Sequence, residues 1–550
     1  ATVNVGGMVA FTSADYLKLT DGARFNAIPN GAADALLTAL PIASFGFLGS
    51  NPGAITAQGS QFSVTEGQGI SLVGGNVTIL SGTPDGGTAQ PARLSAPNGN
   101  ILLASAASPG EFSAATLQPL PNVDGASFSS FGSIALASGS NINVSGTNMV
   151  SIRGGQFVLS VNDAVLTTSQ TTGLTETISL SPGSSIVTSN SGTDPGTDVH
   201  LIASNVQLDG ASIITSPAVG SIGKGGDVTI SVTGSATFTD SQIQTGPVPD
   251  FVSFVGSAGV VSITADASLT MTNTRIDSSA FFAGGDAGPV TLTSNGPISL
   301  TDSSIFTSAS APGNGGAVTI TGKDVTLNNS IVRADVDNGI IDAVSDPAMV
   351  QVRPGTVTVT AQDTVTLSGS GRGNRIISAT AYGTLLDAGS ITITGKTVNL
   401  SNGTISATLN DGGVESPANG GTIEIRGNNM NSTRFELFSN AENISESSGT
   451  GGQILIRGAD NLRAENIQLT DSSLNTSSGG GGGAGKIEFQ TKVLTLSNHT
   501  DVATASFGQG PGGVITVRGA EDVTIESGSR VVSDVVIGPA GLSQGTAGII

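Results

Sequence analysis

Short runs in which apolar and polar residues alternate recur along the chain, and they predict β-strands. One face of each run carries Val, Ile or Leu and the other carries Thr, Ser or Lys, the period-two pattern of a half-buried strand. A clear example is Gly225-Gly226-Asp227-Val228-Thr229-Ile230, a glycine corner followed by an alternating strand. The same phrase returns around Gly259, Gly288, Gly316, Gly355, Gly389, Gly421, Gly452, Gly485, Gly513 and Gly548.

These copies lie about 32 residues apart on average, within the range of repeat architectures. A second phrase follows most copies by nine or ten residues and ends in Asn, Asp or Gly, as in Leu300-Thr301-Asp302 and Leu367-Ser368-Gly369. These residues tolerate a left-handed backbone, so the phrase predicts a strand that ends in a sharp bend. We expect left-handed geometry at Asp240, Asn273, Asp302, Asn329, Asn402 and Asn498. In the copy headed by Gly421, no second phrase is recognisable over residues 428–438.

Each repeat therefore predicts three short strands, which a single repeat cannot bury but a stack of repeats can. The predicted fold class is all-β, a right-handed parallel β-helix (β-solenoid) with three short strands per rung. A β-propeller is the alternative, but its four-stranded blades need longer repeats. The constant offset from the repeat glycine predicts one inward column formed by Val228, Val261, Val290, Val318, Val357, Ile391, Ile423, Ile454, Ile487 and Ile515.

The first part of the chain shows the same alternation with less regular spacing. We expect strands at 70–73, 77–79, 101–103, 134–136 and 142–144, and loops at 109–110 and 119–121, where prolines interrupt. Residues 35–55 predict an N-terminal extra-helical hairpin or loop packed on the flank, because they are rich in Leu and Phe while Pro41 and Pro52 disrupt ladder pairing. The predicted domains are 1–115, 116–224 and 225–550.

Composition narrows the function. The chain of 550 residues has 20 Lys and Arg against 41 Asp and Glu, a net charge of −21, and no Cys. Thiol chemistry, disulfides and cysteine zinc sites are therefore excluded. Nucleic acid is not an expected partner, because binding its phosphates requires a basic surface. At 11% charged residues, the chain does not have the composition of a charge-driven disordered segment.

Candidate chemistry is sparse. His200 and His499 lie far apart in the sequence, and each is expected to be a surface or turn residue. One repeat carries an acidic group whose start resembles a calcium loop but lacks the remaining ligand spacing and the closing Glu, so a solvated loop is the preferred interpretation. That group is Asp335, Asp337, Asp342 and Asp346. No catalytic residue, cofactor-binding residue or metal ligand is predicted.

Four short motifs follow one another near the start of the chain: residues 3–10 (VNVGGMVA) with 13–15 (SAD), 47–55 (FLGSNPGAI), 72–77 (LVGGNV) and 94–101 (LSAPNGNI). In order and spacing they resemble the secretion domain of two-partner-secretion exoproteins, the filamentous haemagglutinin-like family. The repeats after residue 225 are similar to the Gly-rich arrays of such exoproteins. The family's upstream Asn-Pro-Asn-Gly-type motif is not in this sequence, and the last repeat stops at Ile550. We therefore expect the chain to be part of a longer protein.

The resemblance implies passage through a dedicated outer-membrane barrel transporter and an extracellular place on the bacterial outer cell surface. It implies a non-enzymatic role as an adhesin, or as a filament or biofilm matrix component. The expected partners are surface glycans or proteins of a host or neighbouring cell, and further copies of the chain in end-to-end contact. The alternative is a polysaccharide-active β-helix enzyme, a lyase or hydrolase. Scarce aromatic residues and only two His favour the adhesin or fibre.

Overall fold

The structure is a computed structural model, and every regular element in the described residues is a β-strand. Within those residues no helix is long and apolar enough to cross a membrane. For residues 119, 133, 135–136, 140–143, 150–153, 156–159, 165–167, 171–180, 185–187, 200 and 202–204 only the backbone is described. The structure describes residues 1–550 except 30, 32–39, 84–86, 89, 91, 97–100, 116–118, 131, 137–139, 144–149, 154–155, 160–164, 168–170, 181–184, 188–197, 218–222, 248–255, 281–284, 311–312, 338–352, 383–386, 411–417, 443–448, 461, 480 and 537–545.

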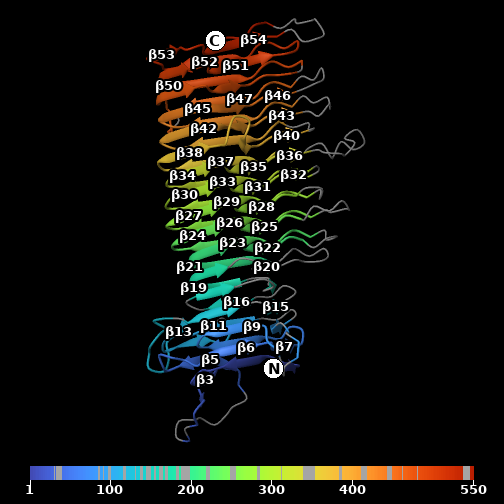
Figure 1. Cartoon of the computed structure of the whole chain (residues 1–550), viewed down its shortest axis with the longest axis vertical. Coiled ribbons are helices and arrows are strands. Elements are labelled where there is room, and N and C mark those ends of the chain that lie inside the picture. The colour runs from blue at the N-terminus through green and yellow to red at the C-terminus, as the bar shows by residue number, and fades with distance from the viewer. Residues whose placement is uncertain are drawn as a thin grey trace, which may run out of the picture. The chain divides into compact units, whose positions relative to one another are not determined.

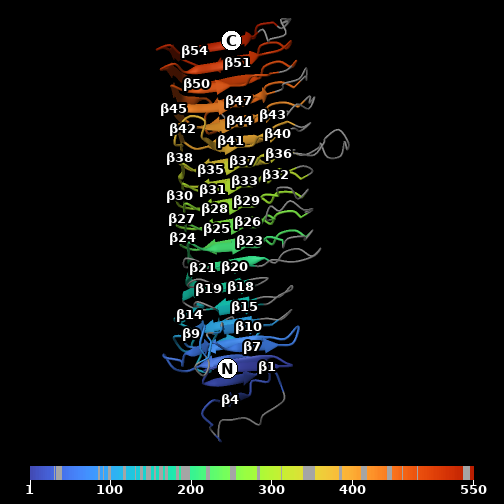
Figure 2. The ribbon, with the colours of Figure 1, turned by 45° about the vertical axis from the view of Figure 1, so that its right-hand side comes forward.

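The chain forms two compact units, and each is a stack of parallel strands (Figures 1 and 2). The first unit comprises Ala1–Asn190, Pro195–Thr215 and Gly226–Ile243, and the second comprises Ser191–Asp194, Ser216–Gly225 and Gln244–Ile550. The predicted parallel β-helix is confirmed, and the propeller alternative is wrong. The three predicted domains stay a prediction.

In the first unit, three strands make each rung, and each strand pairs in parallel with its counterpart in the next rung. The predicted strands are confirmed wherever the residues are described. The rungs begin with β1 (Thr2–Val5), then β2 (Val9–Thr12), β6 (Ile55–Gln58) and β7 (Gln61–Val64), then β8 (Ile70–Gly74), β9 (Val77–Leu80) and β10 (Ala92–Ser95), then β11 (Ile101–Ser105), β14 (Ser133–Leu136) and β15 (Ser140–Asn143). They continue through β16 (Val150–Arg153), β17 (Gln156–Leu159), β18 (Val165–Thr167), β19 (Thr171–Leu180), β20 (Ser185–Val187), β21 (Val199–Asp209), β22 (Ser212–Ile214), β23 (Val228–Val232) and β24 (Ser235–Thr239).

The extra-helical element of this unit is a five-stranded antiparallel sheet, so the predicted hairpin is too small. Its strand order is β13-β12-β5-β3-β4. Two predicted loops belong to it, because residues 110 and 119 lie in its strands. The sheet joins insertions that leave two different rungs after their first strands, a long-range pairing that local pattern does not show. The strands are β3 (Tyr16–Leu19), β4 (Arg24–Asn26), β5 (Ile42–Phe47), β12 (Gly110–Ser113) and β13 (Pro119–Leu120).

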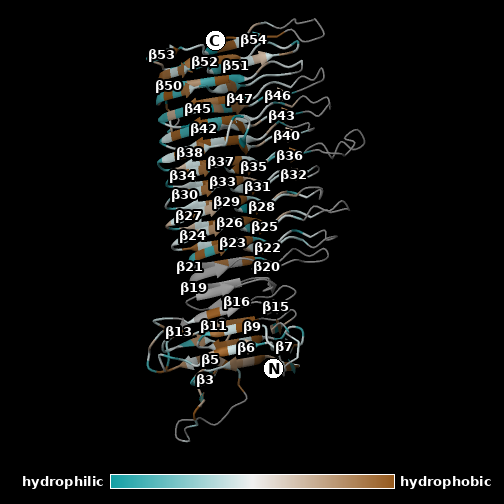
Figure 3. Ribbon diagram, in the orientation of Figure 1, coloured by the Kyte–Doolittle hydropathy of each residue, from teal (hydrophilic) through white to brown (hydrophobic). Residues whose placement is uncertain are grey.

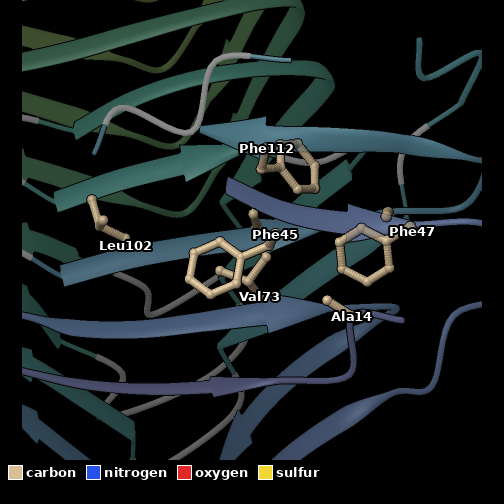
Figure 4. Packing of buried hydrophobic residues seen from close by; sticks show 8 residues of the cluster. Ala14, Phe45, Phe47, Val73, Leu102 and Phe112 are labelled. Atoms are coloured by element: carbon tan, nitrogen blue, oxygen red, sulfur yellow. The ribbon is translucent and has the colours of Figure 1, made fainter. Parts of the chain in front are cut away.

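The sheet packs its aromatic face on the first unit's rungs. Phe45, Phe47 and Phe112 are buried against Val73 and Leu102, which lie on β8 and β11 (Figure 4). The expectation that residues 35–55 are covered by the flank is thus confirmed for the two Phe side chains, while Leu40 remains 45% exposed. Leu36 and Leu37, which the prediction also placed there, lie outside the described residues.

The second unit repeats the same rung more regularly (Figure 1). Its first strands are β26 (Val261–Ala265), β29 (Val290–Ser294), β33 (Val318–Gly322), β37 (Thr356–Ala361), β41 (Ser390–Thr394), β44 (Thr422–Arg426), β47 (Gln453–Arg457), β50 (Lys486–Ser497) and β52 (Val514–Arg518). Its second strands are β27 (Ser268–Thr272), β30 (Ile298–Thr301), β34 (Val325–Asn328), β38 (Thr364–Ser368), β42 (Thr397–Ser406), β45 (Asn429–Phe438), β48 (Ala464–Thr470) and β53 (Asp522–Ile525).

The third side of the rung carries two rows of strands. The inner row is β28 (Arg275–Asp277), β31 (Ser304–Phe306), β35 (Ile331–Arg333), β39 (Arg375–Ser378), the ends of β42 and β45, β49 (Ser473–Asn475), β51 (Asp501–Ser506) and β54 (Arg530–Val535). A further sheet of two-residue strands follows it: β32 (Ala309–Ser310), β36 (Val336–Asp337), β40 (Ala381–Tyr382), β43 (Leu409–Asn410) and β46 (Ala441–Glu442).

The predicted inward column is confirmed. In the second unit its members face one another in register from β26 to β52. Each is at most 2% exposed, and in the first unit Val228 is equally buried and pairs with Val199. The intervening Thr and Ser side chains are more exposed, which gives the strands their alternating colours in Figure 3. Stacking like on like buries an unbroken apolar column, which is the main source of stability in such a fold.

The repeat glycine is required by close approach and not by its own dihedral angles. A Cβ at Gly355 would lie 1.8 Å from the carbonyl oxygen of Gly316, the glycine one rung before. The same distance is 2.0 Å from Gly421 to Gly389 and 2.0 Å from Gly485 to Gly452. Each corner therefore rests directly on the backbone of the previous corner, where no side chain fits.

The predicted left-handed bends are confirmed at all six positions, with φ between 46° and 53°. Gly369 is the exception among the second phrases. An insertion follows β38 there, and the left-handed residue is Gly373, with φ of 77°. Asp471 has φ of 48° and fills the bend of the repeat headed by Gly452, for which no second phrase was predicted.

The irregular repeat after Gly421 has the same geometry with different residues. Ser432 stands in register between Leu400 and Leu469, and Arg434 takes the left-handed bend with φ of 51°. Buried Ser432 forms a hydrogen bond with the hydroxyl of Ser472 at 3.0 Å. A buried hydroxyl needs a hydrogen-bond partner, and Ser472 supplies it. Because Ser replaces the usual Leu and Arg replaces the usual Asn or Asp, the second phrase cannot be recognised in the sequence.

We expect Gly355→Ala to destabilise the second unit, because the new methyl group would overlap the Gly316 carbonyl oxygen. Overpacking of this kind costs about 1–3 kcal/mol. Urea unfolding followed by circular dichroism measures the loss. Gly371→Ala is the matched control, since no atom lies within 4 Å of its Cβ position. Equal midpoints for the two variants would show that the corner stacking is not a constraint.

Val318→Asp should unfold the rungs around β33, because its carboxylate would enter a dry apolar column without a partner. The expected cost is about 3–5 kcal/mol or more. Thr319→Asp places the same group on the outward face of the same strand and should be nearly neutral. Limited proteolysis with mass spectrometry would locate new cleavage sites near β33 in the first variant only.

Candidate functional site

A groove of about 760 Å³ lies on the third side of the second unit. We call it the arginine groove. It concentrates three of the 20 basic residues of this acidic chain in one place, together with a Phe and one of only two Tyr. The residues that define it are Arg275, Phe306, Arg333, Asp335, Arg375 and Tyr382.

Strand register brings these residues together. On the inner row, Asp277, Phe306, Arg333 and Ser378 face one another in consecutive rungs; the first three are partly exposed and Ser378 is buried. On the outer row, the register pairs Asp337 with Tyr382. Because consecutive rungs are about 4.8 Å apart, residues remote in sequence become neighbours. The two rows form the two banks of the groove.

The guanidinium groups lie over an aromatic surface. The Cζ atom of Arg275 lies 4.4 Å from the ring centroid of Phe306, and that of Arg333 lies 5.9 Å from it. Arg275 is also paired with Asp277 at 2.5 Å. The Nε of Arg333 is buried and makes no hydrogen bond to any described residue. The groove therefore holds one guanidinium whose hydrogen-bonding capacity is incompletely used.

Arg375 of the inner row contacts Tyr382 of the outer row across the groove. Arg375 donates a hydrogen bond from Nη1 to the hydroxyl of Tyr382 at 2.7 Å. The insertion over residues 369–374 precedes β39 and shifts its register, and Gly373 and Asn374 from this insertion also line the groove. Burial opposes the charge of Arg375, but the Tyr382 hydroxyl and the nearby Asp335 and Glu442 outweigh it and raise the pKa of the guanidinium above its ordinary value.

Asp335 lies deeper and is part of the wall. Its carboxylate accepts hydrogen bonds from the Ser378 hydroxyl at 2.8 Å and from the Thr380 backbone N–H at 2.7 Å. Burial raises the pKa of Asp335 above its ordinary value, although these hydrogen bonds and the charges of Arg333 and Arg375 act to lower it. The negative charge of Asp335, which would partly balance the arginines, is therefore disfavoured.

The predicted acidic group is only partly in the groove. Asp335 and Asp337 line it, while Asp342 and Asp346 lie outside the described residues. Asp335 lies near arginines, which is unlike a calcium loop. Among the described residues, no group of three or more His, Cys, Asp or Glu is placed to hold a metal ion.

The two histidines lie in different elements. His499 occupies the bend after Asn498 with φ of 62°, and its backbone N–H donates to the Ser527 carbonyl oxygen. His200 lies in β21, where its backbone pairs with Thr229. The prediction that His499 is a turn residue is confirmed, and His200 lies within a strand.

The arginines and aromatic residues of the groove were not predicted. They stand at outward strand positions, where the fold does not require a particular residue type. The alternation of apolar and polar residues, which was used to predict the strands, therefore does not reveal them. The available signal was a substitution pattern. Arg375 stands at a third-strand position that is Thr, Glu, Ser and Asp in the next four rungs, and Arg333 stands at one that is Ser in the next two.

A second arginine cluster of this unit surrounds Glu424 on β44. Buried Glu424 accepts hydrogen bonds from Arg426 and from Arg457, its neighbour one rung further. Burial alone would raise the pKa of Glu424, but these two hydrogen bonds hold it below its ordinary value. The cluster thus places two guanidinium groups around one carboxylate, and, as in Arg333, the Nε of Arg426 is buried and makes no hydrogen bond to any described residue.

Comparison with protein-family models, curated proteins and solved structures gives no match to this chain. The class is therefore defined by the structure alone, as a parallel β-solenoid that carries an open lateral groove lined by arginine and aromatic side chains. The resemblance to two-partner-secretion exoproteins stays a prediction from sequence motifs.

Asp335→Asn should raise the stability of the protein relative to the wild type, and this gain should be larger at neutral pH than at acid pH. Because the folded pKa of Asp335 lies above its ordinary value, the wild type loses stability as pH rises from about 4 through that folded pKa, when the buried group must ionise. The Asn variant does not pay this cost and still accepts the Thr380 N–H.

The measurement is the difference in melting temperature between variant and wild type at about pH 3.5 and at about pH 7. The difference should be larger at the higher pH. The control is Asp337→Asn, an exposed carboxylate two residues along the chain, for which little change is expected. A pH-independent difference for Asp335→Asn would contradict the burial argument.

Proposed function

We propose that this chain is a secreted, non-enzymatic protein of the bacterial cell surface, an adhesin that binds acidic glycans in the arginine groove. The solenoid supplies a rigid stack of rungs, and the groove supplies the recognition groups. Transport through an outer-membrane barrel and an extracellular location rest on the sequence resemblance. The single observation that carries the binding role is the cluster of Arg275, Arg333 and Arg375 around Phe306 and Tyr382.

These side chains suit the chemistry of an acidic sugar. A guanidinium binds a carboxylate or sulfate through two parallel hydrogen bonds. Aromatic rings offer a flat apolar surface with a polar edge, on which a sugar ring can pack. The groove is open along its length and is built on strands, so its groups are held in place before a ligand arrives.

The attraction must act at short range. With a net charge of −21, the whole chain repels a polyanion at long distance. At physiological ionic strength charges are screened beyond about 8 Å, so the repulsion is weak at the cell surface while contacts inside the groove persist. We therefore expect slow association that moderate salt accelerates, the reverse of the usual behaviour of a basic glycan-binding surface.

A polysaccharide-active enzyme is the second candidate, and one observation favours it. Asp335 is a carboxyl group with a raised pKa in the groove, with Asp337 two residues away, and paired carboxyl groups perform general acid–base chemistry on glycans. Against it, Asp335 is held by Ser378 and Thr380 within the wall. The same binding experiment separates the two candidates through turnover of the probe.

The test is binding of the chain to immobilised hyaluronan, polygalacturonate, chondroitin sulfate and dextran, measured by biolayer interferometry. Acidic probes should bind and neutral dextran should not. Arg333→Gln with Arg375→Gln should weaken binding by about 10- to 100-fold, the range for loss of charge-assisted hydrogen bonds. Arg530→Gln removes an equally charged side chain that is paired with Asp501 on another rung, and it should have little effect.

The outcomes discriminate clearly. Equal losses in both variants would mean that binding follows net charge and not the groove. Binding of no acidic probe would overturn the proposal. Release of new reducing ends or unsaturated sugars from a probe would support the enzyme instead. Labelling of intact cells with an antibody against the chain tests the surface location separately.

A further inference from the structure

A second groove, of about 360 Å³, lies on the same side of the second unit. We call it the amide groove. Its polar groups are amides, a hydroxyl and one carboxylate, and its apolar element is a phenyl ring that is 46% exposed. The residues that define it are Asn410, Asn440, Glu442, Asn475, Ser477 and Phe507.

The two grooves meet on the outer row of short strands. Strand register pairs Asp337 with Tyr382, Tyr382 with Asn410, and Asn410 with Glu442. Tyr382 lines the arginine groove, and Asn410, its direct partner one rung further, lines the amide groove. The grooves are therefore consecutive parts of one track that runs across the strands.

The track is long enough for a polymer. From Arg275 to Phe507 it crosses the rungs of β28, β31, β35, β39, β43, β46, β49 and β51, all in the second unit. At about 4.8 Å per rung, this is about 34 Å. Such a length far exceeds one sugar and matches an extended chain of several sugars.

The amide groove is arranged to donate hydrogen bonds. The backbone N–H of Ser477 donates to the side-chain oxygens of Asn440 and Asn475 at 3.0 and 2.9 Å, which orients both amides. With the oxygens engaged, the NH₂ groups are left to donate to a ligand. Glu442 is exposed and accepts hydrogen bonds but repels anions, so this part of the track favours neutral hydroxyl-bearing sugars.

An insertion flanks the track and fixes one bank. Arg372 donates to the backbone oxygen and the carboxylate of Asp471, which lies 99 residues further along the chain. The backbone N–H of Gly373 donates to Glu436, which also accepts from Thr404. The insertion, which contributes Gly373 and Asn374 to the arginine groove, is thus anchored on later rungs.

We infer that the track binds a linear polysaccharide lengthwise, with the acid groups of its charged sugars bound by the arginines and a neutral sugar packed on Phe507 in the amide groove. The inference rests on the proposed function for the arginine groove. Asn475, Phe507 and Glu442 extend it to the amide groove. The ligand class is a chain in which acid-bearing sugars alternate with neutral ones. The acid is a carboxylate or a sulfate, which share the same guanidinium chemistry.

The experiment compares a tetrasaccharide with a decasaccharide of hyaluronan, in which uronate and neutral sugars alternate, by isothermal titration calorimetry. The decasaccharide should bind about tenfold tighter or more, because its second half adds contacts without a second loss of translational freedom. The double variant Asn475→Ala with Phe507→Ala should reduce decasaccharide affinity to the tetrasaccharide level. Tetrasaccharide affinity should not change.

The matched control is Leu462→Ala, which removes an exposed apolar side chain that does not line either groove. Chondroitin sulfate fragments of both lengths distinguish sulfate from carboxylate. Polygalacturonate fragments, with an acid on every sugar, should gain little from length because Glu442 repels them. Circular dichroism and melting temperature verify that each variant is folded.

Equal affinity of the two hyaluronan lengths, or a length effect that survives the double variant, would overturn the track. If the track is overturned but the double variant Arg333→Gln with Arg375→Gln still weakens tetrasaccharide binding, the proposed function remains supported without the track. If no acidic fragment binds at all, the proposed function fails as well. The two failures are thus separated by the tetrasaccharide result.

Discussion

The contact between consecutive glycine corners is the constraint on which the rest of this structure depends. Because each repeat glycine rests on the carbonyl oxygen of the one before, as Gly355 does on Gly316, the rungs cannot shift along their strands relative to one another. A slip of one residue would turn Val and Ile outward and Thr inward. The corners therefore hold the register, the register keeps the apolar column continuous, and the column supplies the burial that one rung alone lacks.

The same regularity leaves the outer surface free to vary. Insertions leave the stack at corners, where an extra segment does not disturb the pairing of neighbouring rungs. In the first unit, two such insertions meet in an antiparallel sheet whose Phe45, Phe47 and Phe112 side chains pack on the rungs. In the second unit, the insertion at residues 369–374 forms part of the wall of the arginine groove. Both added features sit on a scaffold that is already complete without them.

Sequence reasoning succeeded where one residue must do one job in every rung. The Val and Ile column, the glycine corners and the Asn or Asp bends were all predicted, since substitution at these positions is penalised by burial, close approach or backbone strain. It failed where two residues share the job, as with buried Ser432, whose hydroxyl is satisfied only by Ser472. The arginine groove was not predicted, for the opposite reason. Packing does not constrain outward positions, so Arg333 and Phe306 can stand where other rungs carry Ser without disturbing the pattern that predicts the strands.

The Arg372 contact with Asp471 changes how the second unit can open. In a solenoid each rung touches only its neighbours, so thermal openings are expected to spread one rung at a time. The bond from Arg372 reaches past the rungs of Asn402 and Arg434 to a bend 99 residues away, and Gly373 adds a contact to Glu436 on the way. This exposed brace links rungs that are not neighbours, so the amide hydrogens beneath it are expected to exchange in a more concerted way than those of a stack held by nearest-neighbour pairing alone.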